Sequence, residues 1–312
     1  MGFSRGSTAN TGSRDVEFVL TYRPLFDLIC VYTVLAFSQY AALRAGLFSL
    51  ATPAFASIGG YAGAIVLKET HLGPILGALA AMLCGVASGL FLSLPLARLR
   101  GAFQSIATIG FVQIMVSLTL YAQPVTGGAL GFNAIPKVAT TGPLVLVVIA
   151  LAALLAVINR SGIGRAFDAI RQDYTVARSL GISVSRYFRY AFALSGAIGA
   201  LGGCLLAYNT YSIQPDVFGF PMLVSVIAAV ILGGRSMVAG PIVGTVFLIV
   251  LPELIRPLAD ERLLLQGLLL IVVIIYLPQG IVDSLAHRWK LRRASTASSA
   301  DQRERAHGVP SP

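Results

Sequence analysis

Charged residues are scarce in this chain. Of its 312 residues, 12% are Asp, Glu, Lys or Arg, about half the share that is usual in soluble proteins, whereas 56% are hydrophobic. A water-soluble fold of this length could not bury so much apolar surface. Since the apolar residues recur in long blocks, we expect lipid to surround most of the chain.

Cysteine and histidine are also rare, with three of each. Cys30, Cys84 and Cys204 each fall inside an apolar stretch, without a CxxC pair or a nearby histidine. This placement predicts small buried hydrophobes rather than disulfides or metal ligands. The histidines have no carboxylate or cysteine at ligand spacing, so no metal site is predicted.

Motifs for catalysis are absent from the sequence. It contains no GxxxxGK[ST] run that could cradle a phosphate, and no Ser, His and Asp set that the spacing would reveal. A membrane enzyme acting on lipids is an alternative, but it would need clustered Asp, His or Arg at the ends of spans. We therefore predict that the chain is not an enzyme.

The net charge of +10 is distributed in short segments between the apolar blocks. Arg98 and Arg100 mark one boundary, and residues 160–189 hold six arginines against two aspartates. This is the pattern of the positive-inside rule, which makes both segments cytoplasmic. Because no aromatics are interleaved with these basic residues on a soluble face, nucleic-acid binding is not predicted.

Apolar blocks of about 20 residues predict an all-α polytopic membrane protein with about 8–10 transmembrane helices, some broken, in two pseudo-repeated halves. The candidate spans are 25–43, 47–67, 74–97, 102–121, 143–159, 190–208, 220–233, 240–256 and 263–281. A polar segment, 1–23, precedes the membrane domain, 24–286, and a basic tail, 287–312, follows it. The tail is expected to be disordered and cytoplasmic.

The first span is expected to act as an uncleaved signal, because residues 1–21 lack an apolar core. Counting spans backward from the basic tail puts the N-terminus outside. The slight excess of arginine before the first span favours the inside. The second segment is the expected source of this conflict, because it need not cross in one piece.

Two stretches combine apolar residues with helix-breaking ones. AGLFSLATPAFASIGGYAGA contains Pro53 and several glycines, and LGGRSMVAGPIVG places glycines and Pro241 between two late blocks. The first stretch is therefore predicted to be a broken or re-entrant element. Paired interruptions indicate a binding site near the membrane midplane. Alternatively, the glycines only let helices pack closely.

Polar residues inside the predicted spans are candidates for a solute path, because they are costly in lipid. They are Asp27, Gln39, Ser49, Gln104, Gln113 and Glu253. Asp27 and Glu253 lie near span ends, where they are expected to reach water. Ser49 and Thr52 in the interrupted segment, and Thr126 in an external loop, are stronger candidates.

The loop 160–189 contains a helical pattern. Apolar residues recur at spacings of three and four, and Gly181 follows as a C-terminal cap would. These apolar residues are Phe167, Ile170, Tyr174, Ala177 and Leu180. Such a helix can rest in lipid headgroups or fill a groove on a partner, and the pattern alone leaves both open.

The run GRAFDAIRQDYTVARSLGISVSRY resembles the cytoplasmic loop of LivM-type permeases, the membrane subunits of branched-chain amino acid ABC transporters in the hydrophobic amino acid uptake family. In that family this helix docks into a cleft of the ATP-hydrolysing subunit. The resemblance implies docking positions at Gly164, Arg165, Ala169, Ile170, Arg171, Asp173, Ala177, Arg178, Leu180, Gly181 and Ile182.

Three further stretches, GLFSLATPAFASIGGYAGA, TGGALGF and VILGGRSMVAGPIVGT, resemble the same family, so the resemblance covers about 25–285. The predicted translocation path comprises Ser49, Thr52, Phe55, Gly59, Tyr61, Thr126, Gly127 and Gly128. Leu47, Ala51 and Thr52 stand where the family usually has Gln and a Gly-His pair. If those groups contact solute, this chain carries a different one.

The resemblance implies the permease subunit of an ABC importer for branched-chain or other small amino acids in the bacterial cytoplasmic (inner) membrane. Implied partners are two cytoplasmic ATP-binding subunits, a second permease subunit, a periplasmic or extracellular solute-binding protein and membrane lipid. No cofactor is implied, because the partner subunits bind ATP. Alternatives are a permease of this family for urea, an amide or a carboxylate, or a stand-alone secondary transporter, which has no reason to keep a docking helix.

Overall fold

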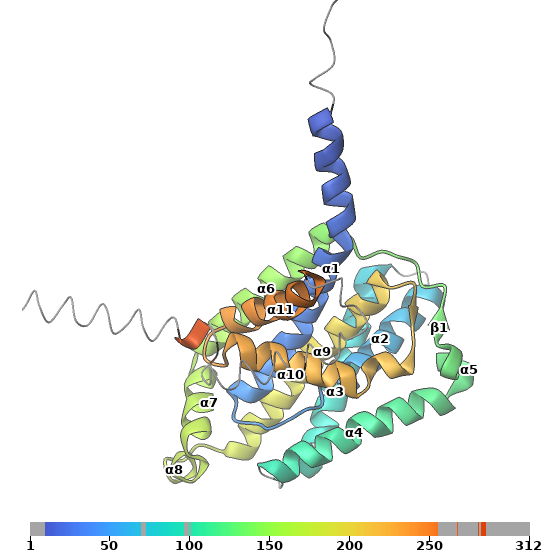
Figure 1. Ribbon diagram of the computed structural model, residues 1–312. Helices are drawn as coiled ribbons and strands as arrows, with labels where there is room; N and C mark the ends of the chain where they lie inside the picture. Colours follow the sequence, from blue (N-terminus) through green and yellow to red (C-terminus); the bar gives the residue numbers. More distant parts are fainter. Residues whose placement is uncertain are drawn as a thin grey trace, which may run out of the picture. The chain divides into compact units, whose positions relative to one another are not determined.

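A computed structural model describes residues 10–69, 73–96, 99, 101–254, 267, 280 and 282–284 (Figure 1). The chain divides into two units, residues 1–227 and 228–312, and each is described by itself. Helices dominate the described part of each unit. The predicted all-α class is confirmed.

Seven helices of more than one or two turns lie wholly in the described part of unit 1. They are α1 (Asn10–Arg44), α2 (Thr52–Glu69), α3 (Pro74–Leu96), α4 (Ala102–Tyr121), α6 (Thr141–Arg160), α7 (Gly162–Gln172) and α9 (Val184–Asn209). The short elements are α5 (Gln123–Thr126), η1 (Gly128–Leu130), β1 (Phe132–Asn133), α8 (Tyr174–Ser179), β2 (Ser212–Ile213) and η2 (Pro215–Phe218). Helix α10 (Phe220–Gly233) crosses into unit 2, which contains α11 (Ala239–Leu254).

Six helical segments in the described part of the chain are long and apolar enough to cross a membrane. They are Arg23–Arg44, Pro74–Leu96, Ala102–Tyr121, Thr141–Arg160, Val184–Asn209 and Pro215–Gly233. The polytopic prediction is confirmed. Most of the predicted span 263–281 and the whole tail 287–312 lie outside the described residues, and the predicted internal repeat stays a prediction.

The long helices of unit 1 run between two ends, which we name after α7 and α5. At the α5 end, Arg23 Nε at the start of the α1 span donates to Thr141 Oγ1 at 3.0 Å, and α1 finishes at Arg44 beside α7. Helix α2 returns, because Lys68 Nζ near its end donates to the Asn133 carbonyl at 3.2 Å. The predicted interruption of the second segment, 47–67, is present as the extended residues 47–51, whereas α2 itself is continuous.

Helix α9 forms the centre of unit 1, with 83% of its apolar window buried, whereas α3, α4 and α6 are 28%, 22% and 17% buried. Small residues allow this packing. A Cβ on Gly59 of α2 would lie 2.1 Å from the carbonyl oxygen of Ala200, and one on Gly85 of α3 would lie 2.3 Å from that of Gly196. Such close backbone approach is typical of membrane helices, where glycine interfaces replace the hydrophobic effect.

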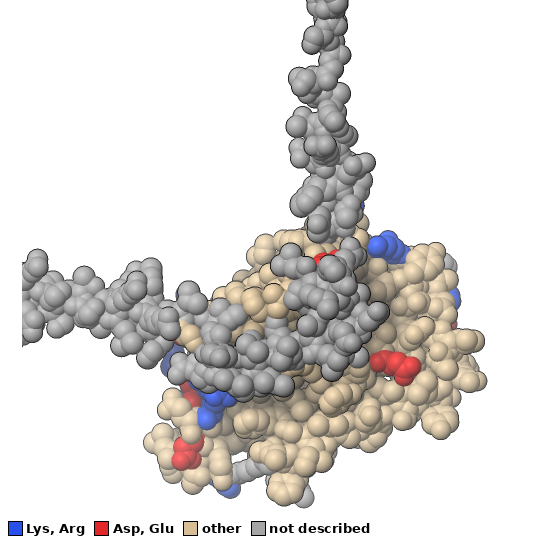
Figure 2. Space-filling model, in the orientation of Figure 1, with Lys and Arg blue, Asp and Glu red and all other residues tan. Residues whose placement is uncertain are grey.

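The peripheral helices expose apolar side chains. Figure 2 shows that most of the visible surface that is not grey is tan, with blue and red groups near α7 and α8 at the lower left and a few more at the top and right. Cys84 lies exposed on the outer face of α3, which corrects its predicted burial, while Cys30 and Cys204 are buried. Asp27 is only 4% exposed, so its expected access to water is also wrong.

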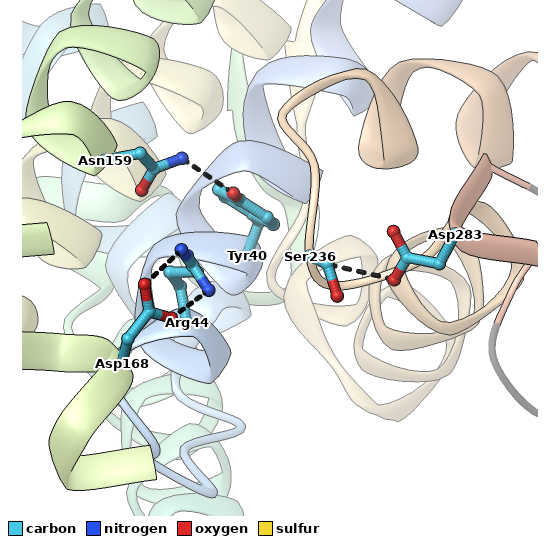
Figure 3. Close-up of polar contacts among 6 residues, drawn as sticks. All are labelled: Tyr40, Arg44, Asn159, Asp168, Ser236 and Asp283. Atoms are coloured by element: carbon cyan, nitrogen blue, oxygen red, sulfur yellow. Dashed lines mark hydrogen bonds and ion pairs between the residues drawn. The ribbon is translucent and has the colours of Figure 1, made fainter. Parts of the chain in front are cut away.

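In unit 2, α10 and α11 are joined by the predicted glycine-rich interruption. Gly234 has a φ of 107°, and the Ser236 amide donates to Asp283 Oδ2 at 3.0 Å (Figure 3). A Cβ on Gly233 would lie 1.8 Å from the Gly240 carbonyl oxygen. The glycines at this turn therefore permit both its left-handed backbone and the close approach of the two helices.

Replacing Gly59 with alanine should lower the free energy of unfolding by about 1–3 kcal/mol, because the methyl group collides with the backbone of α9. Gly142→Ala is the matched control, since a Cβ there meets nothing within 4 Å. The control should change stability by less than about 1 kcal/mol. Thermal unfolding in detergent measures both, and equal stabilities would contradict the proposed packing.

Candidate functional site

An extended segment, residues 47–51, connects α1 to α2 at the α7 end. Helix α1 stops because Gly46 adopts a φ of 78°, and the Leu47 amide donates to the Ala42 carbonyl at 3.1 Å. This is the hydrogen-bond pattern of a Schellman motif. Helix α2 begins at Thr52 with Pro53 in its first turn, where the missing amide proton costs nothing.

Side chains of helix α4 provide hydrogen-bond partners for the backbone of this segment from one side. The Phe48 amide donates to Gln104 Oε1 at 3.1 Å, and the Leu50 amide donates to Thr108 Oγ1 at 3.0 Å. Ser105 Oγ donates to the Phe48 carbonyl at 2.8 Å. These three side chains replace the partners that a helix or sheet would have supplied.

Helix α1 satisfies the segment from the other side. Gln39 Nε2 donates to the Ser49 carbonyl at 2.7 Å, and Thr52 Oγ1 donates to Gln39 Oε1 at 2.9 Å. Ser38 Oγ lies 3.3 Å from Thr52 Oγ1 and donates to the Ser195 carbonyl of α9 at 2.8 Å. Buried backbone outside a helix or sheet requires such internal partners.

The predicted docking helix is in fact two helices, α7 and α8. Asp173 breaks it, with φ −154° and ψ 113°, and its carboxylate caps α8 by accepting from the Thr175 amide at 2.7 Å and the Val176 amide at 3.2 Å. The hydrogen bonds from Val176 and then Thr175 hold the pKa of Asp173 below its usual value. Gly181, with a φ of 82°, ends the element as predicted.

The predicted apolar face is divided by this break. Phe167, Ile170 and Ala177 are buried, whereas Tyr174 is 44% and Leu180 is 73% exposed. The buried three join a core cluster contributed by several helices of unit 1. The cluster includes Ala42, Leu47, Phe55, Leu92, Leu96, Phe188 and Phe192. The face therefore packs mainly on the protein itself, rather than on lipid or a partner as the pattern had suggested.

The other predicted docking residues lie along α7, α8 and the turn that follows. Gly164 is buried, and a Cβ there would lie 2.4 Å from the Asn159 carbonyl oxygen. Arg165, Asp173, Arg178 and Gly181 are exposed, and Ala169, Arg171 and Ile182 are half-buried. Two kinds of residue are thus mixed in the predicted set: those that hold α7 in place, and those that present a surface.

An ion pair joins α7 to the end of α1. Arg44 contacts Asp168 through both carboxylate oxygens, with Nη2 to Oδ2 at 2.8 Å (Figure 3). A Cβ on Gly46 would lie 3.2 Å from the Cα of Arg171, so the turn and α7 are in contact. Arg44 was not among the residues predicted from the sequence. Its position at the end of an apolar span, facing a loop that contains carboxylates, was the available signal.

A second polar contact lies beside this pair. Asn159 Nδ2 at the end of α6 donates to Tyr40 Oη of α1 at 2.9 Å (Figure 3). Helix α6 leads directly into α7. Both ends of the α6–α7 connection are therefore bonded to the last two turns of α1, just before the extended segment.

The residues predicted for the translocation path do not gather in one pocket of the described chain. Ser49 and Thr52 belong to the network at the extended segment, and Phe55 packs against Phe111 with ring centroids 6.3 Å apart. Gly59 contacts α9. The ring of Tyr61 lies 6.1 Å from that of Phe218, and its buried hydroxyl has no hydrogen-bond partner among the described residues.

Thr126, Gly127 and Gly128 form a turn at the opposite, α5 end. Thr126 Oγ1 donates to the Thr119 carbonyl at 2.6 Å and accepts from the Gly128 amide at 3.3 Å. The two glycines have φ values of 76° and 59°, which L-residues rarely adopt. The Thr-Gly-Gly motif thus has a structural explanation, and its role in the path stays a prediction.

Thr108→Val should lower the free energy of unfolding by about 1–3 kcal/mol, because it leaves the Leu50 amide without its acceptor. Thr119→Val is the matched control: this hydroxyl is also buried on α4, but it bonds only to carbonyls of its own helix. Thermal unfolding and proteolysis between α1 and α2 measure the effect. If both variants lose the same stability, the extended segment does not depend on α4.

Comparison with known proteins gives a family. Residues 25–276 match the family described as the permease component of branched-chain amino acid transport systems. The chain is 32% identical over 289 residues to the high-affinity branched-chain amino acid transport system permease protein LivM of Escherichia coli K12, covering 80% of this chain and 67% of the relative.

Two other relatives are more distant. LivH of Salmonella typhimurium LT2, also a branched-chain amino acid transport permease, is 28% identical over 59% of this chain and 64% of its own length. The autoinducer 2 import system permease LsrC of Yersinia enterocolitica is 28% identical over 63% of this chain and 55% of its own length. No solved structure matches. The chain spans about two thirds of the length of LivM, and it belongs to the branched-chain amino acid transport permease family, as the membrane permease component of a transport system.

Proposed function

We propose that the chain forms the translocation path of an ATP-driven importer for branched-chain or other small amino acids, and that it has no catalytic role of its own. The names of LivM and LivH support this class of solute. Because Leu47, Ala51 and Thr52 depart from the usual family residues, urea, an amide or a carboxylate remain the alternative solutes for the same fold.

The observation that carries the proposal is the shape of the α7–α8 element. Its base packs on the protein core, while its tip is exposed and partly apolar. Val176 is 53% and Leu180 is 73% exposed, and Arg178 lies between them in sequence. An apolar tip flanked by a cation suits a groove on a cytoplasmic ATP-binding subunit, which supports the docking assignment. A stand-alone transporter would have no use for this tip.

The base of the same element gives a route for transmitting force. Movement of α7 would act on α1 through the Arg44–Asp168 pair and on the turn at Gly46 through Arg171. The extended segment follows directly and bonds to α4 through Gln104 and Thr108. ATP-driven closure of the docked subunits would therefore reach two spans through polar contacts.

The remaining partners follow from this assignment. Two ATP-binding subunits, a second permease and an external solute-binding protein would complete the importer in the bacterial cytoplasmic membrane. Matches to two differently named permeases of the E. coli branched-chain system, LivM and LivH, support a heterodimer of permease chains. With α7 in the cytoplasm, α1 begins on the external side.

Co-expression with its ATP-binding subunits and second permease should yield a detergent-stable complex. In proteoliposomes with the binding protein, we expect ATP-dependent uptake of labelled leucine. Urea, small amides and carboxylates are tested in parallel. Uptake of one of these compounds instead of leucine would change the assigned solute but not the assigned ATP-driven mechanism. Uptake without ATP or without the other subunits would contradict an ATP-driven importer.

Within that complex, Leu180→Asp should weaken association with the ATP-binding subunit by about tenfold or more, because it would bury an unpaired carboxylate at the interface. Leu130→Asp is the matched control, since this leucine is 82% exposed in η1 at the α5 end. The measurement is the binding of the ATP-binding subunit to the purified permease immobilised on a surface. Equal affinity of both variants would exclude α8 from the interface.

Breaking the Arg44–Asp168 pair should uncouple transport from ATP hydrolysis. For Arg44→Ala, we expect the solute transported per ATP to fall by about tenfold, which corresponds to a loss of roughly 1.4 kcal/mol of coupling free energy. The exchanged pair Arg44→Asp with Asp168→Arg should recover part of it. An unchanged ratio in Arg44→Ala, with the complex intact, would exclude the pair from transmission.

A further inference from the structure

The three peripheral helices of unit 1 differ in what they expose. The outer face of α3 carries apolar residues and Cys84, and that of α6 is apolar between Gly142 and Arg160. The exposed large residues in these faces are Ile75, Leu76, Leu79, Leu83, Leu90, Phe91 and Leu94 on α3, and Leu146, Ile149, Leu154 and Val157 on α6. Both faces have the composition that lipid chains require.

The exposed face of α4 is mixed. Phe103, Ile106, Ile114 and Leu118 are exposed apolar residues, but polar residues lie among them. Gly110, Gln113, Ser117 and Tyr121 recur on it at spacings of three and four, and all are exposed. Gln113 and Ser117 make no hydrogen bond with any described residue. An amide without a partner in hydrocarbon costs several kcal/mol, so this face is poorly suited to lipid.

The other polar side chains of α4 are not left without hydrogen-bond partners in this way. Gln104 and Thr108 are turned inward, are at most 2% exposed, and bind the extended segment. Thr119 is 5% exposed and bonds to its own helix. The helix therefore has two polar faces: one satisfied inside the protomer, and one that requires a partner outside it.

The outward face also has a shallow depression. Gln113, Ile114, Ser117, Leu118 and Tyr121 line this wide-open and mainly apolar space of about 420 Å³. Further along the same face, a Cβ on Gly110 would meet nothing within 4 Å. Two polar side chains thus stand beside apolar ones on an open surface, which a second subunit would have to cover before a small amino acid could be enclosed there.

Helix α4 is connected to the moving parts assigned above. Its first turns hold the extended segment, and its last turn leads into α5 and the Thr126 turn at the other end of the unit. A shift of the extended segment would therefore move α4 directly. By contrast, α3 and α6 expose only lipid-compatible faces at membrane depth.

We propose that the outward face of α4, with Gly110, Gln113, Ser117 and Tyr121, lines the water-accessible solute path and that a second permease subunit closes the path from the opposite side. The inference rests on the proposed function. Neutral amide and hydroxyl groups hydrogen-bond the carboxylate and ammonium of an amino acid without holding either as an ion pair, which permits release.

Cysteines introduced one at a time, as Gln113→Cys and Ser117→Cys, test the path in the assembled complex in proteoliposomes. A cationic methanethiosulfonate reagent modifies thiolates, which form only where water reaches. The unaltered chain, whose Cys84 is exposed on α3, reports the lipid-facing rate, and Ile149→Cys on α6 is the matched control. Modification of this subunit is measured by mass spectrometry, with and without ATP and vanadate.

We expect Gln113→Cys and Ser117→Cys to react at least about tenfold faster than Cys84 and Ile149→Cys, with rates that change when ATP and vanadate are added. Rates equal to those of the two lipid-facing thiols would overturn the inference. ATP-dependent uptake is measured in the same vesicles. If uptake occurs while both cysteines stay unreactive, only the path assignment fails, whereas absent uptake would count against the proposed function.

Gln113→Leu provides a second measurement that does not depend on labelling. On a lipid-facing surface, removing the amide should leave transport unchanged. In the path, it should reduce uptake by about tenfold, while the yield and thermal stability of the complex are retained or rise. Unchanged uptake would contradict the assignment of Gln113.

Discussion

The structure depends on one constraint: buried backbone amides and carbonyls must find hydrogen-bond partners inside the protein. Residues 47–51 are extended between two long helices, so most of their backbone groups cannot pair within the segment. Gln39 of α1 and Gln104, Ser105 and Thr108 of α4 provide the missing hydrogen bonds. The segment is thereby held between two spans.

Close helix packing sets the second feature of the fold. Glycines and alanines let α2 and α3 approach α9 until backbone atoms touch, which leaves α9 buried and places α3, α4 and α6 at the periphery. This division explains why α2 is less apolar than the peripheral helices α3, α4 and α6, although it runs between the same two ends. Surrounded mainly by protein, it needs less lipid-compatible surface.

The α7–α8 element contacts both the extended segment and the packed core, and it is exposed at its tip. Its apolar base is part of the protein core, and the Arg44–Asp168 pair fixes it to α1 at the start of the extended segment. Its tip stays exposed. An element anchored on one side and free on the other is suited to transmit the movement of a partner, and α4, with one polar face inward and one outward, is the natural recipient of that movement.

The sequence by itself determined the membrane class, most helix positions, the late glycine-rich turn and the end of the loop element at Gly181, because each follows from local hydrophobicity or backbone preference. Only the tertiary structure decided which polar residues have hydrogen-bond partners inside the protein. Gln104 and Gln113 lie on the same helix and look equivalent in sequence, yet one bonds to residue 48 and the other faces outward. The pairing of Arg44 with Asp168 was likewise beyond prediction, since the two residues are 124 positions apart. The burial of Phe167 was also beyond prediction, because it depends on contacts with several other helices.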